Sequence, residues 1–343
     1  MLGDDRYFLG VDVGSVSTNI VLLRPDNTVK EALYLRTQGR PMQTIQEGIK
    51  QLRTKMGNSA EIIGVGTTGS ARQLAATLLG ADVVKNEITA HAVAASRMNP
   101  EVQTILEIGG QDSKIIILRD GVVSDFAMNT VCAAGAGSFL DQQAARLGIP
   151  IEEFGPLALQ AKHPVQIAGR CSVFAESDMI HKQQLGHSLS DILAGLCQAM
   201  VRNYLNNVGK NKDIQGPIFF QGGVAANPGI CKAFEVELGL PVIVPEHYGV
   251  MGALGAAYLA QEKVGMKSET STRFRGLHLA ETQFQANSFE CSGCANRCEI
   301  VEIKQDGTNL ARWGDRCGKW SATVGVSDGI GVTEHQGEQQ RGA

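Results

Sequence analysis

The sequence is short of aromatic residues and has no excess of positive charge. Aromatic side chains make up 5% of the 343 residues, and the formal net charge at pH 7 is −4. Surfaces that bind nucleic acids cluster lysine and arginine and stack bases on aromatic rings. The chain has no basic stripe of that kind. We therefore expect no nucleic acid partner.

Long apolar segments are also missing. No uninterrupted apolar run reaches the length that spans a bilayer, and the first six residues, MLGDDR, lack the pattern of a signal peptide. We expect a cytoplasmic protein without a membrane partner. In that compartment the eight cysteines are expected to be thiols or metal ligands rather than disulfides.

One short pattern occurs twice. Residues 11–20 read VDVGSVSTNI and residues 106–115 read LEIGGQDSKI, so that Glu107 follows Asp12 at an offset of 95 positions (107 − 12). In both copies an apolar run with an acid in its middle turns at glycine and small polar residues, then resumes as an apolar run. This pattern predicts two β-hairpins with tight turns.

Such turns suit the binding of phosphate. Backbone N–H groups in a glycine turn face an anion, and glycine lets phosphate approach the main chain closely. The expected nucleotide contacts are Gly14, Ser15, Val16, Ser17, Thr18, Gly109, Gly110 and Gln111. Asp12 is expected to hold Mg²⁺ or its waters. The candidates for the hydrolytic chemistry are Asp12, Glu107, Gln111 and Asp112, with the residue that positions water left open, and Lys114 is a candidate phosphate contact.

A third glycine turn follows late in the chain. Residues 219–227 read FFQGGVAAN, where an apolar strand runs into Gly222 and Gly223, and Val224 then begins a helix. This geometry lets a flat base and ribose lie on the backbone, so we expect Gly222, Gly223 and Val224 to contact the nucleotide. Residues 249–257, GVMGALGAA, form a helix of small residues suited to close helix-to-sheet contact. In this order the elements resemble the acetate kinase, sugar kinase, Hsp70 and actin superfamily. That resemblance implies an α/β fold of two ribonuclease-H-like lobes that close on ATP.

Residues 64–69, GVGTTG, offer a competing motif. They fit G-x-G-x-x-G, follow a plausible strand and precede a helix, and Glu87 lies near the place of a ribose-binding acid. A dinucleotide site, however, explains neither hairpin nor the late glycine turn. We therefore interpret residues 64–69 as a loop of the first lobe near the cleft.

Two cysteines lie among small residues near expected helix starts. Cys132 lies in NTVCAAGAGSFLD and Cys171 in GRCSVFAESDM. A helix N-terminus favours a thiolate and stabilises an anionic cluster placed against it. One chain supplies only two such thiols, whereas a [4Fe–4S] cluster usually takes four, so a two-fold dimer would complete the set. Two inert buried cysteines are the alternative, which the residues alone leave open.

These two segments resemble the cluster motifs of the 2-hydroxyacyl-CoA dehydratase activators, which belong with the ATPase subunits of benzoyl-CoA reductase. The likeness spans about residues 6–262. It implies a homodimer with one bridging [4Fe–4S] cluster on Cys132 and Cys171. It also implies an ATP-hydrolysing electron donor to a CoA-ester dehydratase, a CoA-ester reductase or a related double-cluster reductase. Ferredoxin or flavodoxin would be the donor to this chain.

The C-terminal part carries four further cysteines. Cys291, Cys294, Cys298 and Cys317 have the ligand number for Zn²⁺ or a second iron–sulfur cluster, and the spacing does not decide between them. We expect an ATPase domain over residues 6–265, a linker over 266–284, a cysteine-rich segment over 285–325 and a polar tail over 326–343. The segment resembles one in longer, fused activators.

Two other functions remain open at this point. A small-molecule kinase of the same fold would need a substrate-binding acid and gives Cys132 and Cys171 no role. A nucleotide-gated scaffold with a structural zinc module would hold zinc without iron and would reduce no acceptor.

Overall fold

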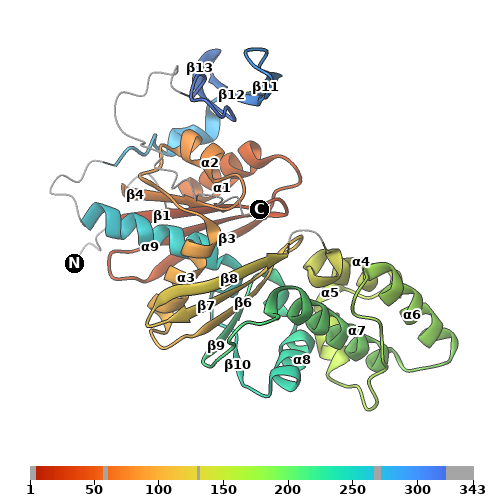
Figure 1. Ribbon diagram of the computed structural model, residues 1–343. Coiled ribbons are helices and arrows are strands. Elements are labelled where there is room, and N and C mark those ends of the chain that lie inside the picture. Colours follow the sequence, from red (N-terminus) through yellow and green to blue (C-terminus); the bar gives the residue numbers. More distant parts are fainter. Residues whose placement is uncertain (1–4, 57–60, 130–131, 266–271, 322–343) are drawn as a thin grey trace, which may run out of the picture. The chain divides into compact units, whose positions relative to one another are not determined.

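The computed structural model describes residues 5–56, 61–129, 132–265 and 272–321. The chain divides into two compact units, Met1–Ala280 and Glu281–Ala343 (Figure 1). Residues 266–271 of the expected linker and the whole expected polar tail, 326–343, lie outside the described residues.

The first lobe is built on a five-stranded sheet in the order β3-β2-β1-β4-β5. β1 and β2 form an antiparallel hairpin, while β4 runs parallel to β1. Nearly every residue of β1 and β2 is buried, which explains their near-continuous apolar sequences. The strands are β1 (Arg6–Val13), β2 (Ser17–Leu23), β3 (Val29–Arg36), β4 (Glu61–Thr68) and β5 (Val83–Val84).

The second lobe repeats this arrangement. Its sheet has the order β10-β9-β6-β7-β8, so that β8-β7-β6-β9-β10 matches β3-β2-β1-β4-β5 strand for strand. β6 and β7 are again an antiparallel hairpin, and β9 is parallel to β6. The strands are β6 (Thr104–Ile108), β7 (Ser113–Arg119), β8 (Val122–Asn129), β9 (Ile218–Gln221) and β10 (Val242–Ile243).

The register confirms the predicted repeat. Asp12 lies opposite Asn19 in the first hairpin, and Glu107 lies opposite Lys114 in the second. Both pairs are separated by the same 95 positions (107 − 12 and 114 − 19). The two halves of the unit therefore present corresponding residues at corresponding places.

Helices cover the sheets. α3 begins at an Asn86 cap and α7 at a Ser188 cap, and both are typical N-cap residues. The helices of the first lobe and of the lobe junction are α1 (Pro41–Met56), α2 (Arg72–Leu79), α3 (Glu87–Met98) and α9 (Met251–Gly265). Those of the second lobe are α4 (Gly137–Leu147), α5 (Ile151–Ala158), α6 (Ser172–Gln184), α7 (Leu189–Tyr204) and α8 (Pro228–Leu238). The short helical turns are η1 (Ala133–Gly135), the π-helical η2 (Leu205–Gly209), η3 (Gly223–Ala226), η4 (Tyr248–Val250) and η5 (Leu277–Glu281).

The small-residue helix α9 packs directly on the first sheet, as predicted. A Cβ at Gly10 of β1 would lie 2.6 Å from the backbone nitrogen of Ala257, and a Cβ at Gly66 of β4 would lie 2.7 Å from the carbonyl carbon of Ala256. α3 packs against α9, and one apolar cluster contains residues of both helices and of both sheets, such as Val21. This cluster joins the two lobes.

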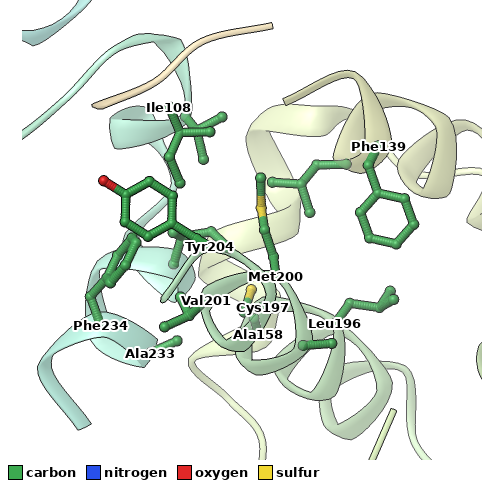
Figure 2. Close-up of a cluster of buried hydrophobic side chains, with 14 of the residues drawn as sticks. Ile108, Phe139, Ala158, Leu196, Cys197, Met200, Val201, Tyr204, Ala233 and Phe234 are labelled. Carbon is green, nitrogen blue, oxygen red and sulfur yellow. The ribbon is translucent and has the colours of Figure 1, made fainter. Parts of the chain in front are cut away.

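A second core lies within the second lobe. Figure 2 shows Tyr204, Met200 and Leu196 of α7 packed with Phe234 of α8 and Phe139 of α4. The rings of Tyr204 and Phe234 meet edge to face, with centroids 5.2 Å apart. This core holds the helices that follow the two cysteine segments.

The G-x-G-x-x-G segment differs from the expectation. Residues 64–68 belong to strand β4 and not to a loop, because β4 pairs with β1 as far as Thr68. Only Gly69, at φ +90°, leaves the strand. The motif is therefore a parallel strand ending in a turn.

The second unit is a three-stranded antiparallel sheet in the order β11-β12-β13. Its strands are β11 (Phe284–Glu290), β12 (Glu299–Gln305) and β13 (Thr308–Trp313). The loop between β11 and β12 carries Cys291, Cys294 and Cys298, and Cys317 follows β13. All four cysteines thus lie outside the strands.

Candidate functional site

A cavity of about 150 Å³ lies between the two hairpins. Both turns, both central carboxylates and the start of α9 line it. A larger cavity of about 490 Å³ shares Gly109, Gly110 and Gly223 with it and extends along Val224 and Tyr248. The two cavities together form one cleft between the lobes.

Asp12 lies on the floor of the smaller cavity. Burial raises the pKa of its carboxyl to about 7, and the negative charge of Glu87 adds to the rise. No cation pairs with Asp12 in the part of the chain that the structure describes. On the neighbouring strands, the Oδ1 of Asn19 and the Oγ1 of Thr68 are buried without a hydrogen-bond partner. These oxygens form an incomplete polar site.

The corresponding carboxylate of the second lobe is paired. The Nζ of Lys114 lies 3.0 Å from Glu107, 2.8 Å from Asp112 and 3.3 Å from Glu87. Burial lowers the pKa of Lys114, but the attraction of Glu107, Asp112 and Glu87 outweighs it, so the pKa lies above its ordinary value. Burial raises the pKa of Glu107 to about 7 against the attraction of Lys114. Lys114, predicted to contact phosphate, is thus engaged with three carboxylates.

A neutral histidine lies beside these charges. His91 of α3 is buried, and burial, followed by the charge of Lys114, lowers its pKa to about 3. Its Nδ1 lies 2.7 Å from the Nε2 of Gln221, which can only donate, so Nδ1 is the acceptor. His91 therefore presents an uncharged imidazole to the cavity.

The two turns have the same internal bond. The amide of Gly14 donates to the Ser17 carbonyl at 2.9 Å, and the amide of Gly109 donates to the Asp112 carbonyl at 3.0 Å. The turns also meet, since a Cβ at Gly110 would lie 2.8 Å from the methyl carbons of Val16. The predicted residues that line the smaller cavity are Asp12, Gly14, Ser15, Val16, Ser17, Glu107, Gly109, Gly110, Asp112, Gly222 and Gly223.

Three predicted residues lie elsewhere. Thr18 is fully buried and shares a hydrogen bond with Thr37. Gln111 is exposed at the tip of the second turn and does not line either cavity. Val224 lines only the larger cavity.

Sequence reasoning did not assign Tyr34 or His91 to the cleft, and it named Glu87 only in the competing dinucleotide motif. Tyr34, Glu87 and His91 line the smaller cavity. Glu87 and His91 are four residues apart on α3 and so lie on one helix face, which was the available signal. That spacing is common on ordinary helices and carries little information on its own.

The segment that carries Cys132 is hydrogen-bonded to the second turn. The amides of Gly137 and Ser138 donate to the carbonyls of Gly109 and Gly110 at 2.8 and 2.9 Å. Asn129 fixes Cys132 itself, accepting from its amide at 3.0 Å and donating to its carbonyl at 3.1 Å. The backbone that follows Cys132 is thus held against the second turn, which lines the cleft.

Cys171 lies at the N-cap of α6, and no side chain caps that helix. α3, α7 and α8, by contrast, are capped by Asn86, Ser188 and Asn227. Both Cys132 and Cys171 are partly exposed free thiols. Val173 and Phe174, directly after Cys171, are each 66% exposed, so that an apolar surface adjoins the second thiol.

The C-terminal cysteines differ in how far their side chains are exposed. Cys291 is buried, and its sulfur accepts hydrogen bonds from the indole of Trp320 at 3.2 Å and the amide of Gly293 at 3.5 Å. The hydrogen bond from Trp320, and to a smaller extent the one from Gly293, holds the pKa of Cys291 below its usual range. Cys294 and Cys317 are exposed. Among the described residues, no group of three or more His, Cys, Asp or Glu side chains is arranged so that it could hold a metal ion.

None of the described helices has the length and apolar character needed to cross a bilayer.

Comparisons with known proteins agree on one family. The model of the BadF/BadG/BcrA/BcrD ATPase family matches residues 9–260. The (R)-2-hydroxyglutaryl-CoA dehydratase activating ATPase of Acidaminococcus fermentans is 34% identical over 265 residues, covering 75% of this chain and 98% of that protein. The 2-hydroxyisocaproyl-CoA dehydratase activator of Clostridioides difficile is 32% identical over 256 residues, covering 74% and 94%.

A solved structure gives the same result. The activator of the 2-hydroxyisocaproyl-CoA dehydratase from Clostridium difficile, with bound ADPNP, superposes with a TM-score of 0.69 at 30% identity. The match covers 77% of this chain and 100% of that one. The two-lobed α/β fold is therefore shared with this structure.

Proposed function

The chain belongs to the BadF/BadG/BcrA/BcrD ATPase family, and we propose that it hydrolyses ATP to drive one-electron transfer from an iron–sulfur cluster to a partner enzyme. One observation carries this proposal. The Gly109–Gly110 turn, which lines the nucleotide cleft, is hydrogen-bonded to the Gly137–Ser138 backbone that follows Cys132. A movement of this turn on nucleotide binding would therefore be passed to the segment that carries Cys132.

ATP would lie across the cleft. The phosphates fit the smaller cavity, where the turn amides face the ligand, and the adenosine fits the larger cavity along Gly223, Val224 and Tyr248. Support also comes from the relative solved with bound ADPNP. Asp112 and Gln111 of the second turn stay candidates for orienting the attacking water.

The residues around Asp12 suit Mg²⁺. This ion prefers oxygen ligands, and the buried Asp12 carboxylate lies beside the unpartnered oxygens of Asn19 and Thr68. Bound there, Mg²⁺ would neutralise charge on the phosphates. Asp12 would hold the ion or its waters, while Lys114 neutralises Glu107 from within the protein.

Cys132 and Cys171 suit a bridging [4Fe–4S] cluster. Each chain offers two partly exposed thiols, and the amides at the start of α6 have no capping side chain to compete with an anion. A second copy of the chain would supply the other two thiols and cover the exposed Val173 and Phe174. The cluster would supply a one-electron couple of low potential.

The electron balance is simple. Ferredoxin or flavodoxin would supply one electron to the dimer and the acceptor would take up one electron, while ATP and water would become ADP and phosphate. The relatives' names indicate a CoA-ester dehydratase or reductase as acceptor. A related double-cluster reductase remains the other acceptor class.

For the second unit we propose a separate metal site on Cys291, Cys294, Cys298 and Cys317. The two N–H donors to the Cys291 sulfur favour a thiolate there. The described residues do not gather three ligands, so the loop between β11 and β12 would have to close around Zn²⁺ or a second cluster. No step of the electron transfer is assigned to this site.

The test is a metal analysis of anaerobically purified protein. Iron, acid-labile sulfide and zinc are measured per dimer in the wild type, Cys132→Ser, Cys171→Ser and the matched control Cys231→Ser, a partly exposed cysteine of α8. We expect the first two variants to lose about four irons per dimer and to keep ATP binding, while the control keeps its iron.

Two results would contradict the proposal. Wild-type iron content in Cys132→Ser or Cys171→Ser would remove that residue from the ligand set. Absence of iron from the wild type, even after anaerobic reconstitution, would leave only the ATP site and favour a kinase or a zinc-bearing scaffold.

A further inference from the structure

The C-terminal end of α7 lies between the two cysteine segments. The Nδ2 of Asn203, which is 2% exposed, is 2.6 Å from the carbonyl oxygen of Gly169 and 3.7 Å from the sulfur of Cys132. Gly169 precedes Cys171 by two residues. A single buried amide thus contacts the segments of both thiols.

The partners fix the orientation of this amide. The Gly169 carbonyl can only accept, so the atom 2.6 Å from it must be the NH₂ group of Asn203. The Oδ1 accepts from the Nδ2 of Asn207 at 2.9 Å. One N–H of Asn203 is therefore bonded to Gly169, and the other is directed at the Cys132 sulfur.

The neighbours of Asn203 hold adjoining segments. Arg202 donates to the carbonyl of Ile167 at 2.9 Å, and the Tyr204 hydroxyl donates to the carbonyl of Lys114 at 2.6 Å. Three successive residues of α7 thus bind the Cys171 segment, the Cys132 segment and strand β7 of the second hairpin.

Gly135, which has no side chain, leaves room for the side chain of Asn203. A Cβ at Gly135 would lie 2.8 Å from the Asn203 Oδ1 and 3.1 Å from the Nδ2 of Asn129, closer than real Cβ contacts normally come. The Cys132 segment is therefore shaped around two asparagine side chains, one of which contacts the sulfur.

We propose that Asn203 is a positioning residue for the iron–sulfur ligands, a role that rests on the function proposed above. It fixes the Cys132 and Cys171 segments relative to one another and donates an N–H···S hydrogen bond to Cys132. Hydrogen bonds to ligand sulfur stabilise the more negative, reduced cluster, so this bond raises the reduction potential. Asn203 touches neither nucleotide nor acceptor.

The experiment uses full-length dimer with two variants and a control. Asn203→Leu removes the donor and keeps the number and branching of the side-chain heavy atoms, and Asn203→Asp keeps the shape while replacing the donor with an acceptor. Asn206→Asp is the control, because Asn206 is exposed one helical turn away and its side chain makes no hydrogen bond or ion pair with the described residues. The first readout is the midpoint potential of the cluster in an anaerobic titration followed by electron paramagnetic resonance.

The second readout does not need the cluster. Hydrogen–deuterium exchange of the cluster-free protein is followed in peptides covering 132–138 and 167–175, with α8 as the internal reference. The contacts of Asn203 with the Cys132 and Cys171 segments are called the clamp below. Loss of the clamp should speed exchange in both peptides and leave exchange in α8 unchanged.

We expect both Asn203 variants to have a lower midpoint potential than the wild type and faster exchange in both peptides, with Asn206→Asp unchanged. A wild-type potential in a cluster-bearing Asn203→Leu would overturn the N–H···S bond. Unchanged exchange in both Asn203 variants would overturn the clamp. A wild type that takes up no iron contradicts the proposed function instead, and the exchange measurement still decides whether Asn203 holds the two segments.

Discussion

Replacing Gly252 with alanine should displace the Asp12 carboxylate within the cavity. A Cβ at Gly252 would lie 2.9 Å from the Asp12 Cγ, nearer still to its Oδ2, and 3.3 Å from the Nε2 of His91. Ordinary contact begins at 3.4 Å, so the Cγ must move by at least about 0.5 Å (3.4 − 2.9) and the oxygen by more. His91 and the buried strands leave it little room to do so.

The expected loss follows from this displacement. A misplacement of about 1 Å in a catalytic group costs on the order of a hundredfold in rate. A shift between about 0.5 and 1 Å should therefore lower Mg·ATP turnover between about tenfold and a hundredfold. Alanine favours a helix over glycine by about 0.5–1 kcal/mol, so the melting temperature should not fall through helix propensity.

Phosphate release from Mg·ATP measures the turnover, and circular dichroism measures the melting temperature. The matched control is Gly265→Ala at the other end of α9, where a Cβ would meet nothing within 4 Å. Wild-type turnover in a folded Gly252→Ala protein would refute the reasoning, as would an equal loss in Gly265→Ala.

Three further single substitutions, one of them also combined with Glu107→Gln, test buried polar groups in and behind the cleft. Lys114→Met leaves three carboxylates without their cation and should lower the free energy of unfolding by about 3–5 kcal/mol. Adding Glu107→Gln to this variant should recover part of the loss, as measured by thermal melting. Equal melting temperatures of the wild type and Lys114→Met would contradict the pairing. Tyr204→Phe removes one buried hydroxyl donor and should destabilise the protein by about 0.5–1.5 kcal/mol in urea with iron content unchanged; a loss of iron would assign Tyr204 another role. Asp12→Ala should impair Mg·ATP turnover without loss of iron, and undiminished turnover would remove Asp12 from the site.

The sequence was informative where structure is local. The hairpins at Asp12 and Glu107 were predictable because apolar runs, a central acid and a glycine turn lie within ten residues, and the register pairs Asp12 with Asn19 and Glu107 with Lys114. The small-residue helix predicted over 249–257 was predictable for the same reason, although α9 itself begins at Met251 after the short turn η4. Its contact with Gly10 and Gly66 follows from the missing side chains.

Residues brought together over long distances were not predictable. Glu87 and His91 reach the cavity because α3 packs against α9, in an apolar cluster that contains residues of both sheets. The amide of Asn203 lies against Cys132, which is 71 positions away in the chain. No pattern in either segment records that contact, because it depends on how α7 packs in the second lobe.

The segment 64–69 shows a different limit. Its glycines fit a nucleotide-binding loop, yet Gly64 and Gly66 are strand residues where bulky groups come close: a Cβ at Gly64 would lie 2.9 Å from the Phe8 ring. A motif of spaced glycines reports close packing as readily as a ligand. Whether such a motif packs closely or binds a ligand is decided by the strands that lie next to it.

The duplicated backbone has a consequence for the direction in which a ligand lies. Gly69 follows β4 as Gly222 follows β9, with φ angles of +90° and +89°, and a Cβ at either would strike the carboxylate of its own hairpin. If only the backbone of the two walls mattered, an elongated ligand could bind in the cleft in either of two opposite orientations. The charges are not duplicated, because Lys114 neutralises Glu107 whereas its counterpart Asn19 leaves Asp12 uncompensated. A ligand that carries a cation would therefore meet an uncompensated carboxylate on one wall and a carboxylate already paired with Lys114 on the other, so the exchange of asparagine for lysine gives a duplicated backbone two unlike walls.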